Sequence, residues 1–265
     1  MLEGMAGETT LRRFPLQAGE DACAFYRQFW TDNLIIRDTA SRIDYAPHCG
    51  PLSVKCAWNG SETYLLDGVP IAVDDTSYLV LNRGRPYASS ISASRPVESL
   101  AVFFRAGFVD GVLRARVTEE DRLLDDPYGR AHPIAFFERR TPHDRRVTPH
   151  LERLRRAHGA DALWLEQELH GLAGALLDAH RRTLREARRL PAVRASTRAE
   201  LLRRLSRARD AIDSDPAARH RLEELARIAC MAPHHFLRRF RDAFGATPHR
   251  YLLAARRRKT QFSGG

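Results

Sequence analysis

The chain has 265 residues and carries 43 Lys and Arg against 33 Asp and Glu, which gives a formal net charge of +10. Hydrophobic residues make up 43% and charged residues 29%, proportions typical of a folded protein, so extensive disorder is excluded. No stretch approaches the ~20 apolar residues that cross a bilayer, and the N-terminus lacks the apolar core of a secretory signal. A cytoplasmic location is therefore expected. Four cysteines without a CxxC pair argue against a zinc finger and a disulfide framework: Cys23, Cys49, Cys56 and Cys230.

The positive charge is concentrated at one end of the chain. Residues 1–190 hold 26 basic and 26 acidic residues, whereas residues 191–265 hold 17 basic and 7 acidic ones, so the entire excess lies in this last part. Nearly all the basic residues are arginine, with Lys55 and Lys259 the only lysines. A compact basic segment behind a neutral one is typical of a protein that binds nucleic acid, with a merely solvated surface as the alternative.

The pattern from about residue 42 to residue 104 predicts β-strands. Short apolar runs alternate with turn signals such as Asn59-Gly60 and Asp67-Gly68, which favour tight hairpins because both central residues of such a turn need positive φ. Strands at intervals of ~8–12 residues indicate a small antiparallel barrel or sandwich, and the stretch 21–38 before them is ambiguous. The runs are LSVKCAW (52–58), ETYLL (62–66), VPIAV (69–73), YLVL (78–81), PYASSIS (86–92) and VESLAVFF (97–104).

Residues 105–150 are charged and interrupted by proline, and they predict irregular structure. Apolar residues then recur at helical spacing and predict a helix over residues 161–188 that ends before Pro191. A stripe of this kind usually packs on its own domain, and a subunit interface is the alternative. The stripe consists of Leu163, Leu169, Leu172, Ala173, Leu176 and Leu177.

After Pro191 the pattern predicts four helices. Thr197 is the expected N-cap of the first, which ends at the break Asp213-Ser214-Asp215-Pro216. Proline suits the first turn of a helix and glycine the position after its end, and these rules set the later bounds. The elements predicted after this break are a short second helix over Leu222–Ala229, a turn at Cys230–Ala232 and a third helix over Pro233–Phe244 closed by Gly245. A fourth helix follows over 248–259, begun by Thr247 and Pro248.

The third of these helices has two different faces when its residues are placed 100° apart. One face is apolar and must be buried. The other is polar and suited to a major groove, where an arginine can bind guanine O6 and N7 together. Two short helices joined by a three-residue turn form a helix-turn-helix. The apolar face consists of Phe236, Leu237, Phe240 and Phe244, and the polar face of His234, His235, Arg238, Arg241 and Asp242.

The string RLEELARIACMAPHHFLRRFRDAFGATPHRYLLAARRRK (221–259) resembles the first helix-turn-helix of the AraC/XylS family of bacterial transcription regulators. The matching features are Leu225-Ala226, Pro233-His234-His235-Phe236, Arg238-Arg239-Phe240, the segment 244–248, Tyr251 and Arg256. The resemblance implies a protein that binds double-stranded DNA, with His234 and Arg238 directed toward base edges and neighbouring basic groups holding phosphates. The DNA-binding residues implied are His234, His235, Arg238, Arg239, Arg241, Thr247 and Arg256.

The sequence departs from the family pattern in three places. Ala232 stands where the family usually has a Ser N-cap, and losing such a cap costs about 0.5–2 kcal/mol. Cys230 holds a turn position that is often Gly, and we expect its φ to remain negative. Family members carry two helix-turn-helix modules, whereas this sequence ends just inside the joining helix, so a truncation after the first module is expected. Because one module makes few phosphate contacts, specific binding is expected to need a homodimer.

A β-barrel ahead of this motif resembles the cupin-like sensor domains of the same family, which implies a small-molecule effector. The rival is a cupin metalloenzyme, whose metal needs several histidines and a carboxylate. The sequence offers His48, with Glu62 at loose spacing. No metal site, catalytic residue or cofactor is therefore expected. The candidate effector-binding residues are Trp58, Tyr64, Tyr78 and Tyr87.

The sequence thus predicts an α+β protein. A cupin-like antiparallel β-barrel (10–150) is followed by a helical linker or dimerisation region (151–195) and an incomplete helix-turn-helix domain (196–265). The expected function is a sequence-specific DNA-binding transcriptional regulator that responds to a small effector and does not associate with membranes. Two alternatives stay open: a truncated copy that acts through dimerisation without binding DNA, and a ligand-binding or enzymatic cupin with an incidental basic tail.

Overall fold

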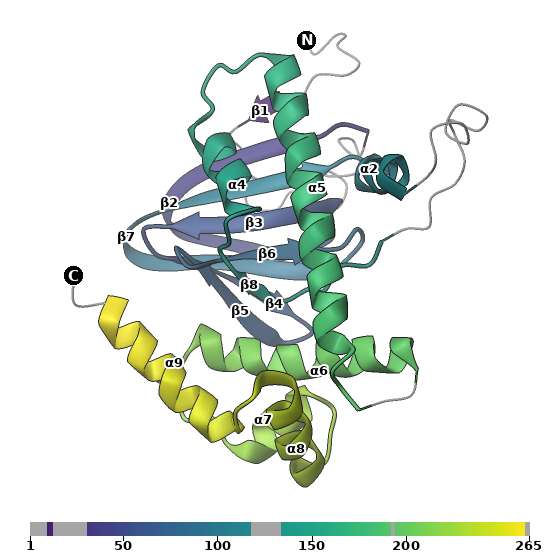
Figure 1. The fold of residues 1–265 in the computed structure, drawn as a ribbon. Coiled ribbons are helices and arrows are strands. Elements are labelled where there is room, and N and C mark those ends of the chain that lie inside the picture. The colour runs from purple at the N-terminus through teal and green to yellow at the C-terminus, as the bar shows by residue number, and fades with distance from the viewer. Residues whose placement is uncertain (1–9, 13–30, 118–133, 192–193, 263–265) are drawn as a thin grey trace.

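The structure is a computed structural model that describes residues 10–12, 31–117, 134–191 and 194–262, with the side chains of 10–12 and 259–262 left out. Cys23 and most of the ambiguous stretch 21–38 lie outside the described residues. A strand-rich part comes first and a helical part second (Figure 1). The predicted α+β class is confirmed.

The strand-rich part is a curled, almost entirely antiparallel sheet in which neighbours follow the order β1-β2-β7-β3-β6-β8, with β4 paired to β5 and β7. The short β1 alone runs parallel to its neighbour among the described strands. These strands are β1 (Thr10–Arg12), β2 (Leu34–His48), β3 (Leu52–Trp58), β4 (Ser61–Leu66), β5 (Val69–Asp74), β6 (Ser77–Leu81), β7 (Tyr87–Phe104) and β8 (Arg140–Pro142).

The long strand β7 curls the sheet into a near-barrel. Its first part pairs with β4 and its second part with β3, while β2 runs antiparallel along both. The two strands predicted over 86–92 and 97–104 are therefore one strand. The register between β2 and β7 shifts between Ala40 and Arg42, opposite residues 93–96. Pro96 is tolerated there because a bulge does not need its missing N–H.

The sequence pattern predicts that the first strand begins at about residue 42, whereas β2 begins at Leu34. The prediction is therefore too late by about eight residues. The middle of β2 carries polar residues on both faces, which hides the alternation on which the prediction depended.

Three helices cover the outer face of the sheet: α2 (Phe108–Val117), α4 (Thr148–Arg156) and α5 (Ala162–Ala187) (Figure 1). The prediction of irregular structure over 105–150 misses α2 and the start of α4. The helix predicted over 161–188 is confirmed as α5. Its apolar stripe packs on the sheet, except for Leu163, which is 69% exposed. The shared core of sheet and helices includes Val54, Leu100, Val102, Leu169, Leu172 and Leu176.

The helical part has a core of its own, centred on Phe236, Phe240 and Leu205. The prediction that Thr197 caps the first helix is wrong, because α6 begins two residues earlier and has Arg194 at its N-cap without a side-chain bond. None of the described helices is both long and apolar enough to span a bilayer. The helices are α6 (Ala195–Ser214), α7 (Leu222–Ile228), α8 (Pro233–Phe244) and α9 (Pro248–Phe262).

The two parts meet where α6 lies against β5 and β8 (Figure 1). The backbone N–H of Ala72 in β5 donates to Ser214 Oγ at 2.8 Å. The backbone N–H of Arg140 in β8 donates to Asp210 Oδ2 at 3.0 Å. These bonds fasten α6 to the edge of the sheet, and α6 is also the helix on which α7 and α8 pack.

Candidate DNA-binding surface and ligand cavities

The turn between α7 and α8 is a Schellman motif. The N–H of Met231 donates to the carbonyl of Ala226, and the N–H of Cys230 donates to the carbonyl of Arg227, both at 2.9 Å. Cys230 has a φ of 51°, in the left-handed region that glycine adopts without strain. The expectation of a negative φ is wrong, because this pair of hydrogen bonds closes the turn around a left-handed residue.

The buried face of α8 forms largely as predicted. Phe236 and Phe240 have no exposed surface, and Phe244 is half-buried beside Tyr251. Leu237 was expected on this face but is 39% exposed. Three residues advance a helix by ~300°, so Leu237 lies ~60° away from Phe240 and reaches the rim of the interface.

The outward face of α8 carries an exposed basic stripe. His234, Arg238 and Arg241 are all exposed and follow one another at spacings of four and three residues, which places them on one line along the helix. We call these three residues the α8 stripe. His235 and Asp242 are exposed beside it. The polar face predicted from the sequence is therefore open to solvent.

Two further predicted residues lie at the side of α8 that faces α6. His235 and the half-buried Arg239 border a hollow whose other wall includes Glu200 and Arg204 of α6. Arg239 also reaches Asp242 at 3.4 Å. These two side chains are thus separated from the α8 stripe by the curvature of the helix, and their predicted role in DNA binding stays a prediction.

Thr247 and Arg256 already have structural partners. The Thr247 hydroxyl accepts a hydrogen bond from the N–H of Arg250 at 3.4 Å, as an N-cap of α9 does. The guanidinium of Arg256 donates from Nε to the carbonyl of Pro216 at 2.7 Å and from Nη2 to the carbonyl of Ala218 at 3.0 Å. Arg256 therefore fastens α9 to the loop after α6, and its predicted DNA contact would add to this role.

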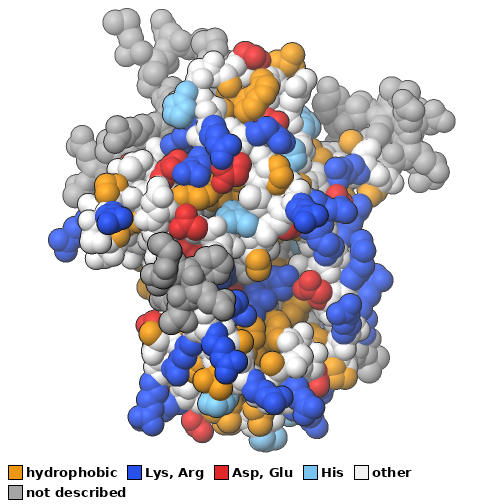
Figure 2. Space-filling view, turned by 60° about the vertical axis from the view of Figure 1, so that its left-hand side comes forward, with side chains coloured by type: hydrophobic (Ala, Val, Ile, Leu, Met, Phe, Trp, Pro, Cys, Tyr) orange, Lys and Arg blue, Asp and Glu red, His pale blue; other side chains and the backbone are white. Residues whose placement is uncertain are grey.

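The surface of the helical part is rich in arginine. Figure 2 shows several groups of Lys and Arg side chains (blue) over its lower part, where the C-terminal helices lie, and only isolated Asp and Glu side chains (red) among them. This distribution agrees with the basic balance of residues 191–265 in the sequence.

The candidate effector residues do not gather in one place. Tyr64 and Tyr87 line a cavity of about 50 Å³ inside the curled sheet, together with the buried His48, Lys55 and Glu62. A liquid water molecule occupies about 30 Å³, so this cavity has room for one or two waters. Its polar groups are nevertheless unusual for the interior of a small barrel.

Lys55 and Glu62 are two buried ionisable side chains that line this cavity. Burial lowers the pKa of Lys55 to about 7, although the carboxylate of Glu62 acts in the opposite direction. Burial likewise raises the pKa of Glu62, opposed by the hydroxyl of Tyr64 and by the charge of Lys55. The Lys55 Nζ lies 3.9 Å from the centre of the Phe103 ring, which partly replaces the lost hydration.

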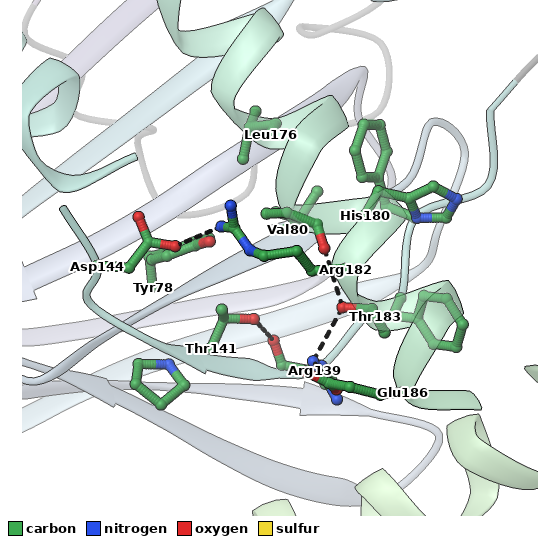
Figure 3. A pocket seen from close by; sticks show the side chains of 14 residues that line it. Tyr78, Val80, Arg139, Thr141, Asp144, Leu176, His180, Arg182, Thr183 and Glu186 are labelled. Carbon is green, nitrogen blue, oxygen red and sulfur yellow. Dashed lines mark hydrogen bonds and ion pairs between the residues drawn. The ribbon is translucent and has the colours of Figure 1, made fainter. Parts of the chain in front are cut away.

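Tyr78 lines a second and larger cavity, of about 200 Å³, on the outer face of the sheet. Its walls come from β6, from residues 136–144 and from α5 (Figure 3). Trp58 borders neither of these two cavities. It is buried below α4, where the guanidinium of Arg155 lies 4.4 Å from its ring centre. Of the four candidate effector residues, Tyr64 and Tyr87 line the cavity in the barrel and Tyr78 lines the outer cavity. Trp58 belongs to the hydrophobic core.

No cluster of three or more His, Cys, Asp or Glu side chains in the described part of the chain is arranged to hold a metal ion. His48 is buried, with Nδ1 2.8 Å from the carbonyl oxygen of Ala46 and its ring 4.3 Å from that of Tyr87.

The sequence reasoning missed Lys55 and Arg139. Lys55 is one of two lysines in the chain and stands in the middle of an apolar strand, LSVKCAW, which is a readable signal of a buried charge. Arg139 is one of many arginines in an irregular segment, and nothing in its surroundings in the sequence marks it as buried.

No family model matches the chain, and no curated protein matches its sequence. Among solved structures, ToxT from Vibrio cholerae aligns over 83% of this chain and 98% of its own, at 9% identity and a TM-score of 0.35. A structure of ToxT from strain SCE256 with an unsaturated fatty acid bound aligns over 83% of this chain and 94% of its own, at 11% identity and a TM-score of 0.39. The function proposed below rests on the residues of this chain alone.

Proposed function

We propose that this protein is a sequence-specific DNA-binding transcriptional regulator of the AraC/XylS type that acts in the cytoplasm and responds to a small effector. The observation that carries the proposal is the two-sided α8. Phe236 and Phe240 have no exposed surface, whereas His234, Arg238 and Arg241 are open to solvent along one line.

The dimensions of α8 suit recognition of duplex DNA. Its 12 residues correspond to a length of about 18 Å, and the major groove, ~12 Å wide, admits one helix. Arg238 lies in the middle of the α8 stripe, so it is the side chain that reaches base edges when α8 enters the groove. An arginine paired with guanine contributes about 1–3 kcal/mol of discrimination between bases.

The surrounding arginines supply the part of the affinity that does not depend on base sequence. Phosphate contacts release counterions, so binding weakens steeply as the salt concentration rises. The helix-turn-helix of α7 and α8 makes few such contacts by itself, and we therefore propose that a homodimer binds the operator. Sedimentation equilibrium of the protein with a duplex carrying one or two half-sites measures this stoichiometry.

The decisive experiment compares three proteins on the DNA upstream of the protein's own gene by fluorescence anisotropy. Arg238→Ala is expected to bind this DNA roughly 5- to 150-fold more weakly than the wild type, while its binding to unrelated duplex changes much less. Arg95→Ala removes an exposed arginine from β7, far from α8, and serves as the control with the same change of charge. Equal binding by wild type and Arg238→Ala at every salt concentration would contradict the proposal.

A further inference from the structure

The outer cavity, defined above by Tyr78, differs from an ordinary packing defect in its lining. One side is apolar, with Val80 and Leu176, and the other carries Arg139, Thr141 and Thr183 (Figure 3). Phe136 also lines the cavity. Its volume of about 200 Å³ is four times that of the cavity in the barrel. A compact molecule with one polar end fits such a lining better than water alone does.

Arg139 is a buried cation that its protein partners neutralise only in part. It is 9% exposed, and the two hydrogen bonds of its guanidinium within the described residues both start from Nη2, to Thr183 Oγ1 at 2.9 Å and to Glu186 Oε2 at 3.2 Å. The Glu186 side chain is half exposed, so water weakens its charge. The charge of Asp210 also acts on this guanidinium, but Nε and Nη1 of Arg139 have no hydrogen-bond acceptor within the described residues.

Tyr78 presents a second donor without an acceptor. The residue is 1% exposed, and its hydroxyl has no hydrogen-bond partner among the described residues. Buried polar groups nearly always have a partner, so a hydroxyl of this kind indicates a missing one. Burial and, to a smaller extent, the carboxylate of Asp144 raise the pKa of Tyr78, which keeps its hydroxyl a donor. The charges of Arg182 and Arg139 act on this hydroxyl in the opposite direction.

His180 lines the cavity beside two aromatic rings, and its buried Nδ1 has no hydrogen-bond partner among the described residues. Its ring centre lies 5.2 Å from that of Phe136 and 5.6 Å from that of Phe137. At the polar end, Arg182 is bound to Asp144 at 2.8 Å (Figure 3). Arg182 is thus paired with Asp144 and is 36% exposed, so water can satisfy its other donors, whereas the Arg139 side chain is only 11% exposed.

We propose that the outer cavity is the effector site of this protein and that it takes a compact organic monocarboxylate. The carboxylate accepts hydrogen bonds from Arg139 and from the Tyr78 hydroxyl, and the apolar body lies against Val80, Leu176 and Phe136. A charged acceptor forms the stronger kind of hydrogen bond with a guanidinium, which distinguishes a carboxylate from a neutral ligand of the same shape.

Ligand binding at this cavity can change the orientation of α6, and the regulatory meaning of such a change rests on the proposed function. Arg139 directly precedes Arg140, whose N–H is bound to Asp210 of α6 and whose carbonyl accepts from Arg209 at 3.0 Å. A ligand that binds Arg139 and shifts its backbone would therefore also shift Arg140, whose hydrogen bonds position α6. The binding experiment below contains no DNA, so its failure is distinct from failure of the DNA-binding proposal.

The test is isothermal titration calorimetry of the full chain with acetate, propanoate, cyclohexanecarboxylate and phenylacetate, each compared with its amide. At least one carboxylate is expected to bind saturably at one site per chain, and its amide at least tenfold more weakly. Tyr78→Phe removes only an oxygen that has no partner among the described residues, so this variant should fold. It is expected to bind the carboxylate roughly 10- to 100-fold more weakly.

Two charge variants complete the test. Arg139→Gln is expected to abolish the binding, whereas Arg146→Gln, which removes a nearby exposed arginine outside the cavity, should bind like the wild type. If Arg139→Gln fails to fold, the binding of the carboxylate by Tyr78→Phe still tests the proposal. The proposal is overturned if no carboxylate binds, if acid and amide bind equally, if Tyr78→Phe binds like the wild type, or if Lys55→Met, in the barrel, abolishes the binding instead.

Discussion

The N–H of Arg140 in β8 donates to Asp210 Oδ2 in α6 at 3.0 Å, across 70 residues of chain. Asp210 has no exposed surface, and its other oxygen accepts from Arg209 Nη2 at 3.0 Å. Arg209 in turn donates to the carbonyl of Arg140. Sheet and helices are thus joined by a closed set of charge-assisted hydrogen bonds, and the orientation of α6 depends on it.

Asp210→Ala should therefore destabilise the fold strongly. The change leaves Arg209 with only the more distant Asp213, at 3.9 Å, and leaves the N–H of Arg140 without an acceptor, which costs about 3–5 kcal/mol of unfolding free energy. Urea denaturation followed by circular dichroism measures the loss. The control is Asp242→Ala, whose carboxylate makes a surface ion pair worth less than about 1 kcal/mol. A loss below 1 kcal/mol for Asp210→Ala would show that the junction is not fixed in this way.

Lys55→Met should stabilise the protein in a pH-dependent manner. The pKa of Lys55 is lowered by burial to about 7 in the fold and is ~10.4 in an unfolded chain. Between these values the unfolded state binds the proton and the folded state does not, so the wild type gains stability as the pH rises from 7.

The penalty of burying the charge of Lys55 is fully present below pH 7. The advantage of Lys55→Met over wild type should shrink by roughly 2 kcal/mol between pH 7 and pH 9, measured by urea denaturation. A difference independent of pH would refute the buried-charge assignment.

The stability of the wild type should also fall on acidification because of His180. Burial, with a smaller contribution from Arg203, lowers its pKa to about 4, whereas an unfolded histidine has a pKa of ~6.5. Below pH 6.5 the unfolded state gains a proton that the folded state still excludes, so stability declines until the pH reaches about 4.

Because His180 is partly exposed and solvent screens its charge, we expect its protonation to lower the unfolding free energy by about 1–2 kcal/mol between pH 7 and pH 5. His180→Phe, whose ring suits the neighbouring Phe136 and Phe137, removes this contribution to the pH dependence. The contributions of the other titrating groups cancel when the two proteins are compared. Guanidinium denaturation at both pH values gives the difference. Parallel acid profiles for wild type and variant would contradict the low pKa of His180.

Cys230→Gly should stabilise the helix-turn-helix. Cys230 has a φ of 51°, and a side chain in this region costs roughly 1–2 kcal/mol, part of which glycine offsets through its greater freedom in the unfolded chain. A net gain of about 0.5–1 kcal/mol is expected, seen as a higher Tm. Cys230→Ala keeps the strain and removes the thiol, so its Tm should stay near that of the wild type. If glycine and alanine shift the Tm alike, the thiol rather than the backbone is responsible.

The sequence by itself determined the elements whose signals are local. Asn59-Gly60 and Asp67-Gly68 mark hairpins, and Pro233 and Gly245 bound α8, because each of these residues decides its own backbone conformation. The two faces of α8 also followed from the sequence, since helical periodicity sets them before any tertiary contact forms. For the same reason Leu237, at the edge of the apolar arc, was the position at which the periodicity gave the wrong answer.

The tertiary structure alone decided which side chains share a cavity. Tyr64 and Tyr78 look alike in the sequence, yet they face opposite sides of the sheet, because the curl of β7 and the packing of α5 decide which face becomes the barrel interior and which is covered by helices. Arg139 becomes a buried cation that lines a cavity only because α5 lies over it. Such burial depends on contacts between residues far apart in the chain, and no pattern within a short window contains that information.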